Sequence, residues 1–528
     1  MAEKKQNFLH GAALLAIATA IVKVIGALYK IPLNAIIGEQ GFGYFYTAYD
    51  IYSVLLLISS AGLPVAMSRM LSAANSLGRY QQVRQIYRVS QTLFLALGAV
   101  GTLLMMLFCK QLAAFQEQPN AWFAIGCLGP CCFLSCLISA YRGYFQGLEN
   151  MIPTSVSQVL EAFFKLIVGI AAAIVLLKLT NNVAYAAGGA ILGVTVSCVI
   201  SSFYLGGKFR GAYRRLPQSN EAPDSFSKTA RGLMAIAIPI TIGSAGLQLL
   251  SVLEAKLYMR QLLGTYTQTQ ADVMKGIYNM TQTIFNMPCA FIVPITISII
   301  PAVTSNLTLH KFKAARAMEE SSARITGLIA MPCAVGLLVL ARPVTALLGG
   351  YTGEKLDLAT SLMALQGVSI LMYAVVQLTT AILQAHNLAT LSVINMILSG
   401  LVRLIVVYVL TGIPSVGLLG APIGAIVCYL LISILNLTVL CHVVRRPPAL
   451  TKNYLRSLLP ALVMGVAVWL VYGILGKITP SRLVLCALPV LVGAAVYAAG
   501  AVLCRSITRR DCLLLPKGDK IANLLHLK

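Results

Sequence analysis

Charged residues are scarce in this sequence. Only 11% of its 528 residues are Asp, Glu, Lys or Arg, whereas 58% are hydrophobic. Soluble globular chains are about 25% charged, so this chain has too little charge to cover its apolar residues in water. The scarcity argues against a soluble protein and predicts an all-α polytopic membrane protein.

Acidic residues and histidines are rarer still, and patterns typical of catalysis are missing. The sequence has 16 Asp and Glu and 5 His, with no D-x-D or H-x-x-x-x-D motif. Enzymes that act on lipid-linked sugars need Asp, His or Glu side chains that converge at loop edges. The sequence therefore predicts that the chain is not an enzyme.

The 13 cysteines do not have the spacing of a metal site. The tightest group, Cys127, Cys131, Cys132 and Cys136, lies inside an apolar run, whereas zinc sites usually pair C-x2-C motifs near polar loops. We interpret these cysteines as small packing residues. The sequence predicts neither a metal nor a cofactor, and it implies no disulfide framework.

Long apolar runs, by contrast, recur along the whole chain. A membrane span needs about 20 mostly apolar residues, and the first run continues past Lys23, too far for a signal peptide. We predict fourteen spans, at residues 11–37, 44–70, 89–114, 120–145, 154–177, 183–206, 232–258, 277–305, 324–348, 357–385, 389–412, 416–443, 454–476 and 482–504.

The net charge of +24 is explained by the placement of the basic residues. They gather in alternate loops, at 69–88, 208–231, 311–324, 445–456 and 505–528. Under the positive-inside rule, this alternation places both termini in the cytoplasm. The fewer basic residues predicted outside are Lys110, Lys178, Arg260, Lys275, Arg342, Lys355, Lys477 and Arg482. The basic residues do not form a DNA-reading motif, so we predict membrane lipids as partners and no nucleic acid.

Two stretches of the chain resemble each other and indicate an internal repeat. FQGLENMIPTSVSQVLEAFFKLIVG, from Phe145, aligns without gaps with LQAHNLATLSVINMILSGLVRLIVV, from Leu383, and pairs Lys165 with Arg403. Parallel repeats of this kind are typical of transporters. We predict a first six-helix lobe at 1–206, a basic linker at 207–231, a second lobe at 232–444, two appended helices at 445–504 and a basic tail at 505–528.

Lys23 and Lys30 lie inside the first predicted span, AIVKVIGALYKIPLNAIIG. A charge at the bilayer centre costs about 2.5 to 3.5 kcal/mol, so such residues usually line an aqueous cavity. Seven residues correspond to about 700° of helix, which places both lysines within about 20° of one face and ~10 Å apart. That arrangement suits a diphosphate, although snorkelling to the interface is an alternative for Lys30.

The other charges within predicted spans have structural and functional interpretations. Asp50 is either an ion-pair partner of a first-span lysine or a gate or ion-coupling site. Glu161 precedes Lys165 by four residues, a spacing that favours mutual neutralisation. The residue four positions before Arg403 is Ser399, not an acid, so Arg403 is a stronger candidate for a functional role than Lys165. Glu254 lies deeper in its span than Lys256, which can snorkel outward.

The segments KVIGALYKIPLNAIIGEQGFGYFYTAYDIYSVLLLISSAGLPVAMSRMLS (23–72) and YRGYFQGLENMIPTSVSQVLE (141–161) carry a family resemblance. They resemble the SpoVB/YtgP branch of polysaccharide exporters. That branch shares a superfamily, the multidrug/oligosaccharidyl-lipid/polysaccharide (MOP) superfamily, with MurJ-like lipid II flippases and multidrug and toxin extrusion (MATE) transporters. The resemblance implies fourteen helices with two six-helix lobes in a V shape. It also implies flipping of an undecaprenyl-diphosphate-linked, lipid II-type cell-wall precursor from the inner to the outer leaflet by alternating access.

The same resemblance implies a cationic cavity and a bacterial cell-membrane location. We assign diphosphate contact to Lys23, Lys30, Lys165 and Arg403, and gating or ion coupling to Asp50, Glu161 and Glu254. Coupling to the membrane potential, Na⁺ or H⁺ is expected in place of a cofactor. We expect a monomer that handles a lipid-linked saccharide, with cell-wall synthesis enzymes as candidate partners.

Two other transport functions stay open. One is a flippase for a different lipid-linked oligosaccharide, such as an exopolysaccharide or a sporulation cortex precursor. The other is a MATE-like drug/cation antiporter, for which acids should dominate the cavity. The excess of basic over acidic residues within the predicted spans argues against the antiporter.

Overall fold

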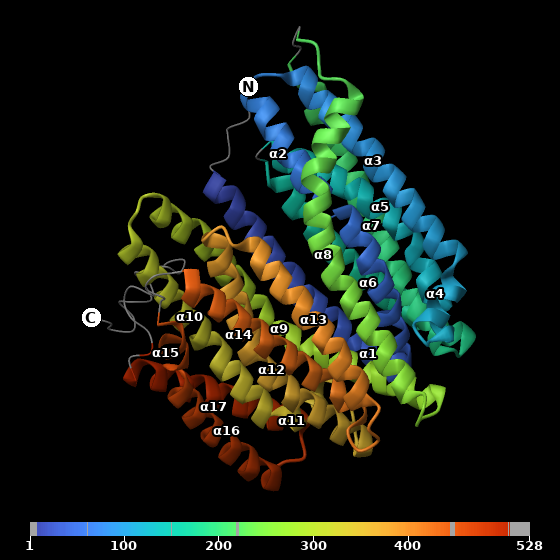
Figure 1. Ribbon diagram of the computed structural model, residues 1–528. Coiled ribbons are helices and arrows are strands. Elements are labelled where there is room, and N and C mark those ends of the chain that lie inside the picture. Colours follow the sequence, from blue (N-terminus) through green and yellow to red (C-terminus); the bar gives the residue numbers. More distant parts are fainter. Residues whose placement is uncertain are drawn as a thin grey trace. The chain divides into compact units, whose positions relative to one another are not determined.

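The computed structural model describes residues 8–60, 62–148, 150–217, 221–443, 449–504 and 506. All regular secondary structure in these ranges is helical (Figure 1). Except for Ser506, the predicted basic tail at 505–528 lies outside the described residues, as does part of the predicted linker. The chain forms two compact units, Met1–Asn279 and Met280–Lys528.

Unit 1 is a bundle of long helices that starts with a broken one. Helix α1, Phe8–Ser60, contains the first predicted span and most of the second, and its backbone leaves helical geometry at Gly38, with φ 67° and ψ 177°. Glycine accepts this positive φ without a Cβ clash. The other helices are α2 Gly62–Ser76, α3 Tyr80–Leu107, α4 Cys109–Phe115, η1 Pro119–Ala121, α5 Trp122–Gly147, α6 Ile152–Thr180, α7 Val183–Arg214, α8 Phe226–Leu262 and the start of α9 Gln268–Thr308.

Close helix approaches hold unit 1 together. A Cβ added to Gly193 on α7 would lie 2.3 Å from the Cα of Gly169 on α6, so the two backbones touch there. Small residues permit such contact between membrane helices. The hydroxyl of Tyr29 on α1 donates to the carbonyl of Ala190 on α7 over 3.0 Å. Together these contacts fix α1 and α6 against α7.

Unit 2 continues from Met280 of α9 and packs around apolar side chains. Its further helices are α10 Phe312–Val339, α11 Ala341–Leu348, α12 Gly353–Ala385, α13 Ala389–Thr411, η2 Gly417–Leu419, α14 Gly420–Val443, α15 Leu450–Leu455, α16 Leu458–Ile478 and α17 Arg482–Leu503. One buried cluster includes Phe285, Met331, Ile370 and Tyr454. The Tyr454 hydroxyl donates to the carbonyl of Leu371 over 2.8 Å, which satisfies the polar end of this side chain.

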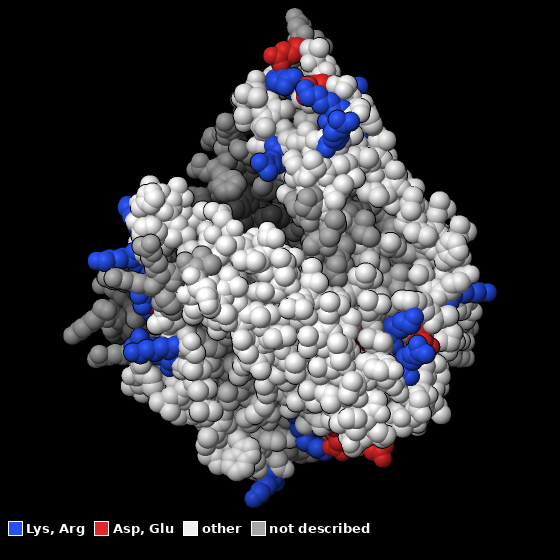
Figure 2. Space-filling view, viewed as in Figure 1, with Lys and Arg blue, Asp and Glu red and all other residues white. Residues whose placement is uncertain are grey.

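Eleven helical segments of the described chain are long and apolar enough to cross a membrane. The first of them, Ile21–Ser76, joins two predicted spans into one. Helices α8 and α9 include residues whose side chains the structure does not describe, and they are not among the eleven. On the face shown in Figure 2, Lys and Arg form a few separate groups with uncharged surface between them. The chain is a multi-pass membrane protein, and the count of fourteen spans stays a prediction.

The compact units divide at a different place from the predicted lobes. Unit 1 includes α8 and the first part of α9, whereas the repeat assigns both to the second lobe. Helix α8 packs against α1, α2 and α3, and a Cβ on Gly62 of α2 would lie 2.2 Å from the Ala237 carbonyl of α8. Compactness and repeat symmetry are separate properties, so the lobe boundaries stay a prediction.

Candidate functional site

Two lysines in unit 1 are surrounded by tyrosine side chains, and we call this group the tyrosine cage: Tyr29, Lys30, Tyr46 and Tyr49 of α1 with Lys165 of α6. The Lys30 amine donates to the Tyr46 hydroxyl over 2.8 Å and lies 4.9 Å from the centre of that ring. The Lys165 amine lies 5.4 Å from the ring centre of Tyr29 and 4.7 Å from that of Tyr49.

The break in α1 builds the cage. Residues on both sides of Gly38 contribute to it, Tyr29 and Lys30 before the break and the other two tyrosines after it. An ammonium within about 6 Å of an aromatic ring centre is attracted by the ring quadrupole without losing its charge. Neither cage lysine makes an ion pair within contact distance to any carboxylate in the described ranges. Both lysines are half-buried.

The acid predicted to neutralise Lys165 pairs with a different residue. Glu161 accepts from the Arg142 guanidinium on α5 over 2.9 Å, and Arg142 also donates to the hydroxyl of Ser157 over 3.0 Å. The direct Glu161–Lys165 pair is therefore a wrong prediction. A planar guanidinium can serve two acceptors at once, which favours arginine as the partner. Glu161 still acts electrostatically on Lys165 from a greater distance.

A second group of polar residues, which we call the Asp272 network, lies buried in the same unit. It consists of Tyr44, Thr47 and Asp50 of α1, Gln118, and Gln268, Asp272 and Lys275 of α9. The Lys275 amine donates to the Thr47 hydroxyl over 2.6 Å and lies 3.8 Å from an Asp50 carboxylate oxygen. Its side chain is 0% exposed.

Asp272 is the acceptor at the centre of this network. One oxygen accepts from the Tyr44 hydroxyl over 2.8 Å, and the other accepts from the Gln118 and Gln268 amides, each over 2.9 Å. The Thr47 hydroxyl also contacts the amide oxygen of Gln118. Buried polar and charged groups need such partners. Asp272 has three hydrogen bonds, and Lys275 has a hydrogen bond to Thr47 and an ion-pair contact with Asp50.

Lys275 corrects the sequence analysis. It was assigned to an outer loop, but α9 begins at Gln268 and carries Lys275 into the interior of unit 1. Asp50 accordingly pairs with Lys275 rather than with a first-span lysine. The missed signal is the i, i+3 spacing of Asp272 and Lys275, which places an acid and a base on one helix face.

The remaining candidates lie in different environments. Lys23 is exposed whereas Lys30 is half-buried, so the structure does not bring the two predicted stripe residues into one environment. Glu254 of α8 is 5% exposed and acts electrostatically on Asp50. Arg403 is half-buried on α13 of unit 2. In the described part of the chain no group of three or more His, Cys, Asp or Glu could hold a metal ion.

The fold matches solved membrane transporters. A structure of lipid II flippase MurJ in an inward closed conformation matches with a TM-score of 0.67, covering 93% of this chain and 98% of that chain at 13% identity. An inward-facing MATE family transporter matches with a TM-score of 0.62, covering 80% and 92% at 16% identity. These matches confirm the predicted all-helical MATE/MurJ-like fold.

Sequence comparison then specifies the family. The chain is 25% identical over 438 residues to stage V sporulation protein B of Bacillus subtilis (strain 168), covering 82% of this chain and 83% of that protein. It is 22% identical over 491 residues to lipid II flippase MurJ of the same organism, covering 89% of each. Residues 8–307 match the family model described as polysaccharide biosynthesis protein. The chain belongs to this family.

Proposed function

We propose that the chain flips a diphosphate-linked lipid saccharide, a lipid II-type cell-wall precursor, from the inner to the outer leaflet by alternating access. The observation that supports this proposal most is the tyrosine cage. It holds two half-buried lysines within membrane-spanning helices, and no carboxylate among the described residues lies at ion-pair distance from either amine. Charged groups at such depth usually act on a substrate or an ion.

The cage suits a diphosphate because tyrosine side chains, and no carboxylate of the described residues, contact its two amines. Tyrosine rings stabilise an ammonium through their faces and leave its N–H groups able to donate to phosphate oxygens. Hydrogen bonds between charged partners are roughly twice as strong as neutral ones. Lysine is a point charge, so we expect a phosphate that can shift between Lys30 and Lys165 rather than one clamped by two parallel bonds.

Asp50 and Lys275 supply a candidate gate or coupling element. The 3.8 Å pair stabilises one arrangement of α1 and α9, and an approaching anion or cation would compete with it. A ligand can shift a two-state equilibrium only through different affinities for the two states, and competition for this pair supplies such a difference. The membrane potential, Na⁺ or H⁺ could each drive the change, with Glu161 and Glu254 as further candidate coupling residues.

Membrane orientation follows from the loop charges. We propose a bacterial cell membrane as the location, with both termini in the cytoplasm, because basic residues concentrate in alternate predicted loops. In this orientation the break at Gly38 lies toward the outer face.

Flipping of another lipid-linked oligosaccharide is the second candidate. It is favoured by the 25% identity to stage V sporulation protein B, a relative whose name refers to sporulation. The cage fits any diphosphate-linked saccharide, so it supports both candidates equally.

Genetic replacement tests the proposal. In a bacterium whose lipid II flippase is depleted, expression of the wild-type chain should restore lipid II in the outer leaflet, measured with an impermeant probe. Lys165→Gln should fail to restore it, whereas Lys256→Gln should succeed, because the Lys256 amine lies 3.7 Å from the ring centre of Phe115, outside the cage. A well-expressed wild-type chain that restores nothing would contradict the lipid II assignment.

A further inference from the structure

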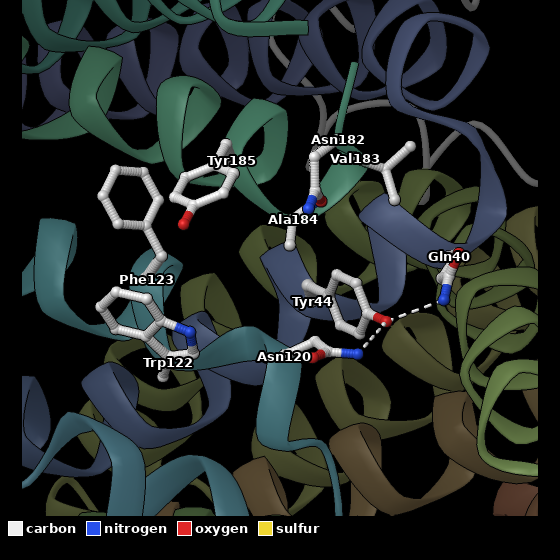
Figure 3. Close-up of a pocket in the computed structure, with 9 residues that line it drawn as sticks. All are labelled: Gln40, Tyr44, Asn120, Trp122, Phe123, Asn182, Val183, Ala184 and Tyr185. Atoms are coloured by element: carbon white, nitrogen blue, oxygen red, sulfur yellow. Dashed lines mark hydrogen bonds between the residues drawn. The ribbon is translucent and has the colours of Figure 1, made fainter. Parts of the chain in front are cut away.

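Unit 1 contains a pocket of about 310 Å³, and none of its lining residues belongs to the tyrosine cage (Figure 3). Three chain segments meet there: the turn of α1 just after Gly38, the start of α5 and the start of α7. Its lining residues are all uncharged, and they are Gln40, Tyr44, Asn120, Trp122, Phe123, Asn182, Val183, Ala184 and Tyr185. The volume is at the small end of the range for ligand sites, about 300 to 1,000 Å³.

One side of the pocket is aromatic. Trp122 and Phe123 are 5.7 Å apart between ring centres with planes at 75°, and Phe123 and Tyr185 are 4.9 Å apart at 63°. Trp122 and Tyr185 are only half-buried, so part of each ring remains available for contact. Aromatic faces pack well against apolar C–H surface and carry a negative quadrupole. The C–H face of a pyranose ring is such a surface.

The other side carries side-chain amides that are held in place. The amides of Gln40 and Asn120 both donate to the Tyr44 hydroxyl, over 2.8 Å and 3.3 Å, which leaves their carbonyl oxygens as acceptors (Figure 3). The Asn182 oxygen accepts from the backbone N–H of Ala184 over 2.9 Å, so its NH₂ group remains a donor. Fixed donors and acceptors opposite an aromatic wall match the hydroxyl edge and the C–H face of one sugar.

We propose that this pocket binds a neutral pyranose unit of the transported saccharide. The inference rests on the proposed flippase function, and it adds a saccharide subsite separate from the lysines. The lack of charge among the nine lining residues selects a neutral sugar, N-acetylated sugars included, over a sugar acid or a sugar with a free, charged amine. The Tyr44 hydroxyl accepts hydrogen bonds from the Gln40 and Asn120 amides of the pocket and donates one to Asp272. The pocket is therefore connected by hydrogen bonds to the network that holds Lys275.

The chain contains a built-in reporter for this site. It has two tryptophans, Trp122 in the pocket and Trp469, 64% exposed, on α16 of unit 2. A Trp469→Phe protein, purified whole in lipid nanodiscs, therefore emits from Trp122 alone. Titration with N-acetylglucosamine or glucose should change this emission saturably, with a dissociation constant on the order of millimolar, as expected for a ligand of this size. Sorbitol, which has similar hydroxyls but no ring, should give no saturable change.

A matched pair of substitutions locates the binding. Asn182→Asp keeps the helix-capping acceptor but replaces the NH₂ donor with a charged oxygen, and it should weaken sugar binding at least about fivefold, the loss expected for one hydrogen bond. Asn181→Asp adds the same charge one position earlier, outside the lining, and should bind sugar within twofold of the parent.

The outcomes separate the pocket from the flippase. A saturable sugar response lost in Asn182→Asp and kept in Asn181→Asp supports the pocket, whatever the transport assay gives. No saturable response, an equal response to sorbitol, or equal effects of the two substitutions overturns it. Failure of the wild-type chain to restore outer-leaflet lipid II contradicts only the assigned substrate, because the fluorescence titration needs no transport.

Discussion

The tyrosine cage and the Asp272 network withdraw lysines from solvent in two different ways. Lys275 is fully enclosed, donates to Thr47 and lies beside Asp50. Lys165 is half-buried and lies over two tyrosine rings, with its predicted carboxylate partner bound to Arg142 instead. Lys275 is thus committed to protein partners, whereas Lys165 and Lys30 retain capacity for an external anion. Under the proposed function, the contrast separates a structural or gating cation, Lys275, from two cations that would bind substrate.

Removal of Lys275 should have the largest effect on stability. Lys275→Met leaves the half-buried Asp50 without this cation, and loss of one partner of a fully buried pair costs about 3 to 5 kcal/mol, which is the upper limit here. We expect a marked fall in the thermal unfolding temperature of the detergent-purified protein. Restoration of much of this loss by Asp50→Asn in the same chain would confirm the coupling, whereas additive losses would contradict it.

Removal of a cage lysine should affect transport more than stability. Lys165→Gln deletes a cation that makes no ion pair among the described residues, so the unfolding temperature should stay close to wild type while transport falls about tenfold or more. Loss of one charged hydrogen bond, about 1.5 to 3 kcal/mol, corresponds to that range. A flipping assay and a thermal scan on the same preparation check the prediction. If Lys165→Gln lost thermal stability as severely as transport, the cage would be a structural element rather than a binding site.

A glycine contact in unit 1 should give an intermediate effect on stability. In Gly193→Ala the new Cβ meets the Gly169 backbone, and overpacking of this kind typically costs about 1 to 3 kcal/mol. The cage should loosen as well, because α6 carries Lys165. Gly207→Ala on the same helix meets nothing within 4 Å and serves as the control. Equal unfolding temperatures for the two variants would contradict the close packing of α6 and α7.

An exposed ion pair should matter least. Arg342 and Asp357 of unit 2 are 2.7 Å apart, but their side chains are 54% and 64% exposed. Solvent screening limits such pairs to about 0 to 1 kcal/mol. Arg342→Ala should therefore leave the unfolding temperature nearly unchanged in the scan used for Lys275→Met. A comparable fall in unfolding temperature for both substitutions would contradict the expectation that the buried ion pair contributes more to stability than the exposed one.

The fold was predictable from the sequence because hydropathy and loop charge can be read from short, continuous segments of the chain. Apolar runs of span length predicted the helices, and the resemblance at 23–72 and 141–161 predicted the superfamily. Both cage lysines were also selected, since a lysine inside an apolar run is visible in the sequence. Lys275 was missed because it lies just before the predicted eighth span, where a basic residue looks like a loop residue.

The side chains that contact each site residue were harder to predict than the site residues themselves. The partner of Glu161 comes from another helix, and an i, i+4 spacing on the same helix gave no sign of Arg142. The tyrosines around Lys165 are far from it in sequence and meet it only because α1 breaks at Gly38 and α6 packs close to α7. Sequence spacing can identify neighbours along one helix, but tertiary packing decides which of them bind.

The most direct test of the account is transport by the purified chain alone. Proteoliposomes that contain the wild-type protein and a fluorescent polyprenyl-diphosphate disaccharide should expose more of this lipid to an impermeant quencher than protein-free liposomes do. Lys30→Gln/Lys165→Gln protein of unchanged unfolding temperature should match the protein-free rate, and Lys256→Gln should match wild type. Wild-type transport that persists in the double variant would contradict the central claim that the tyrosine cage binds the diphosphate.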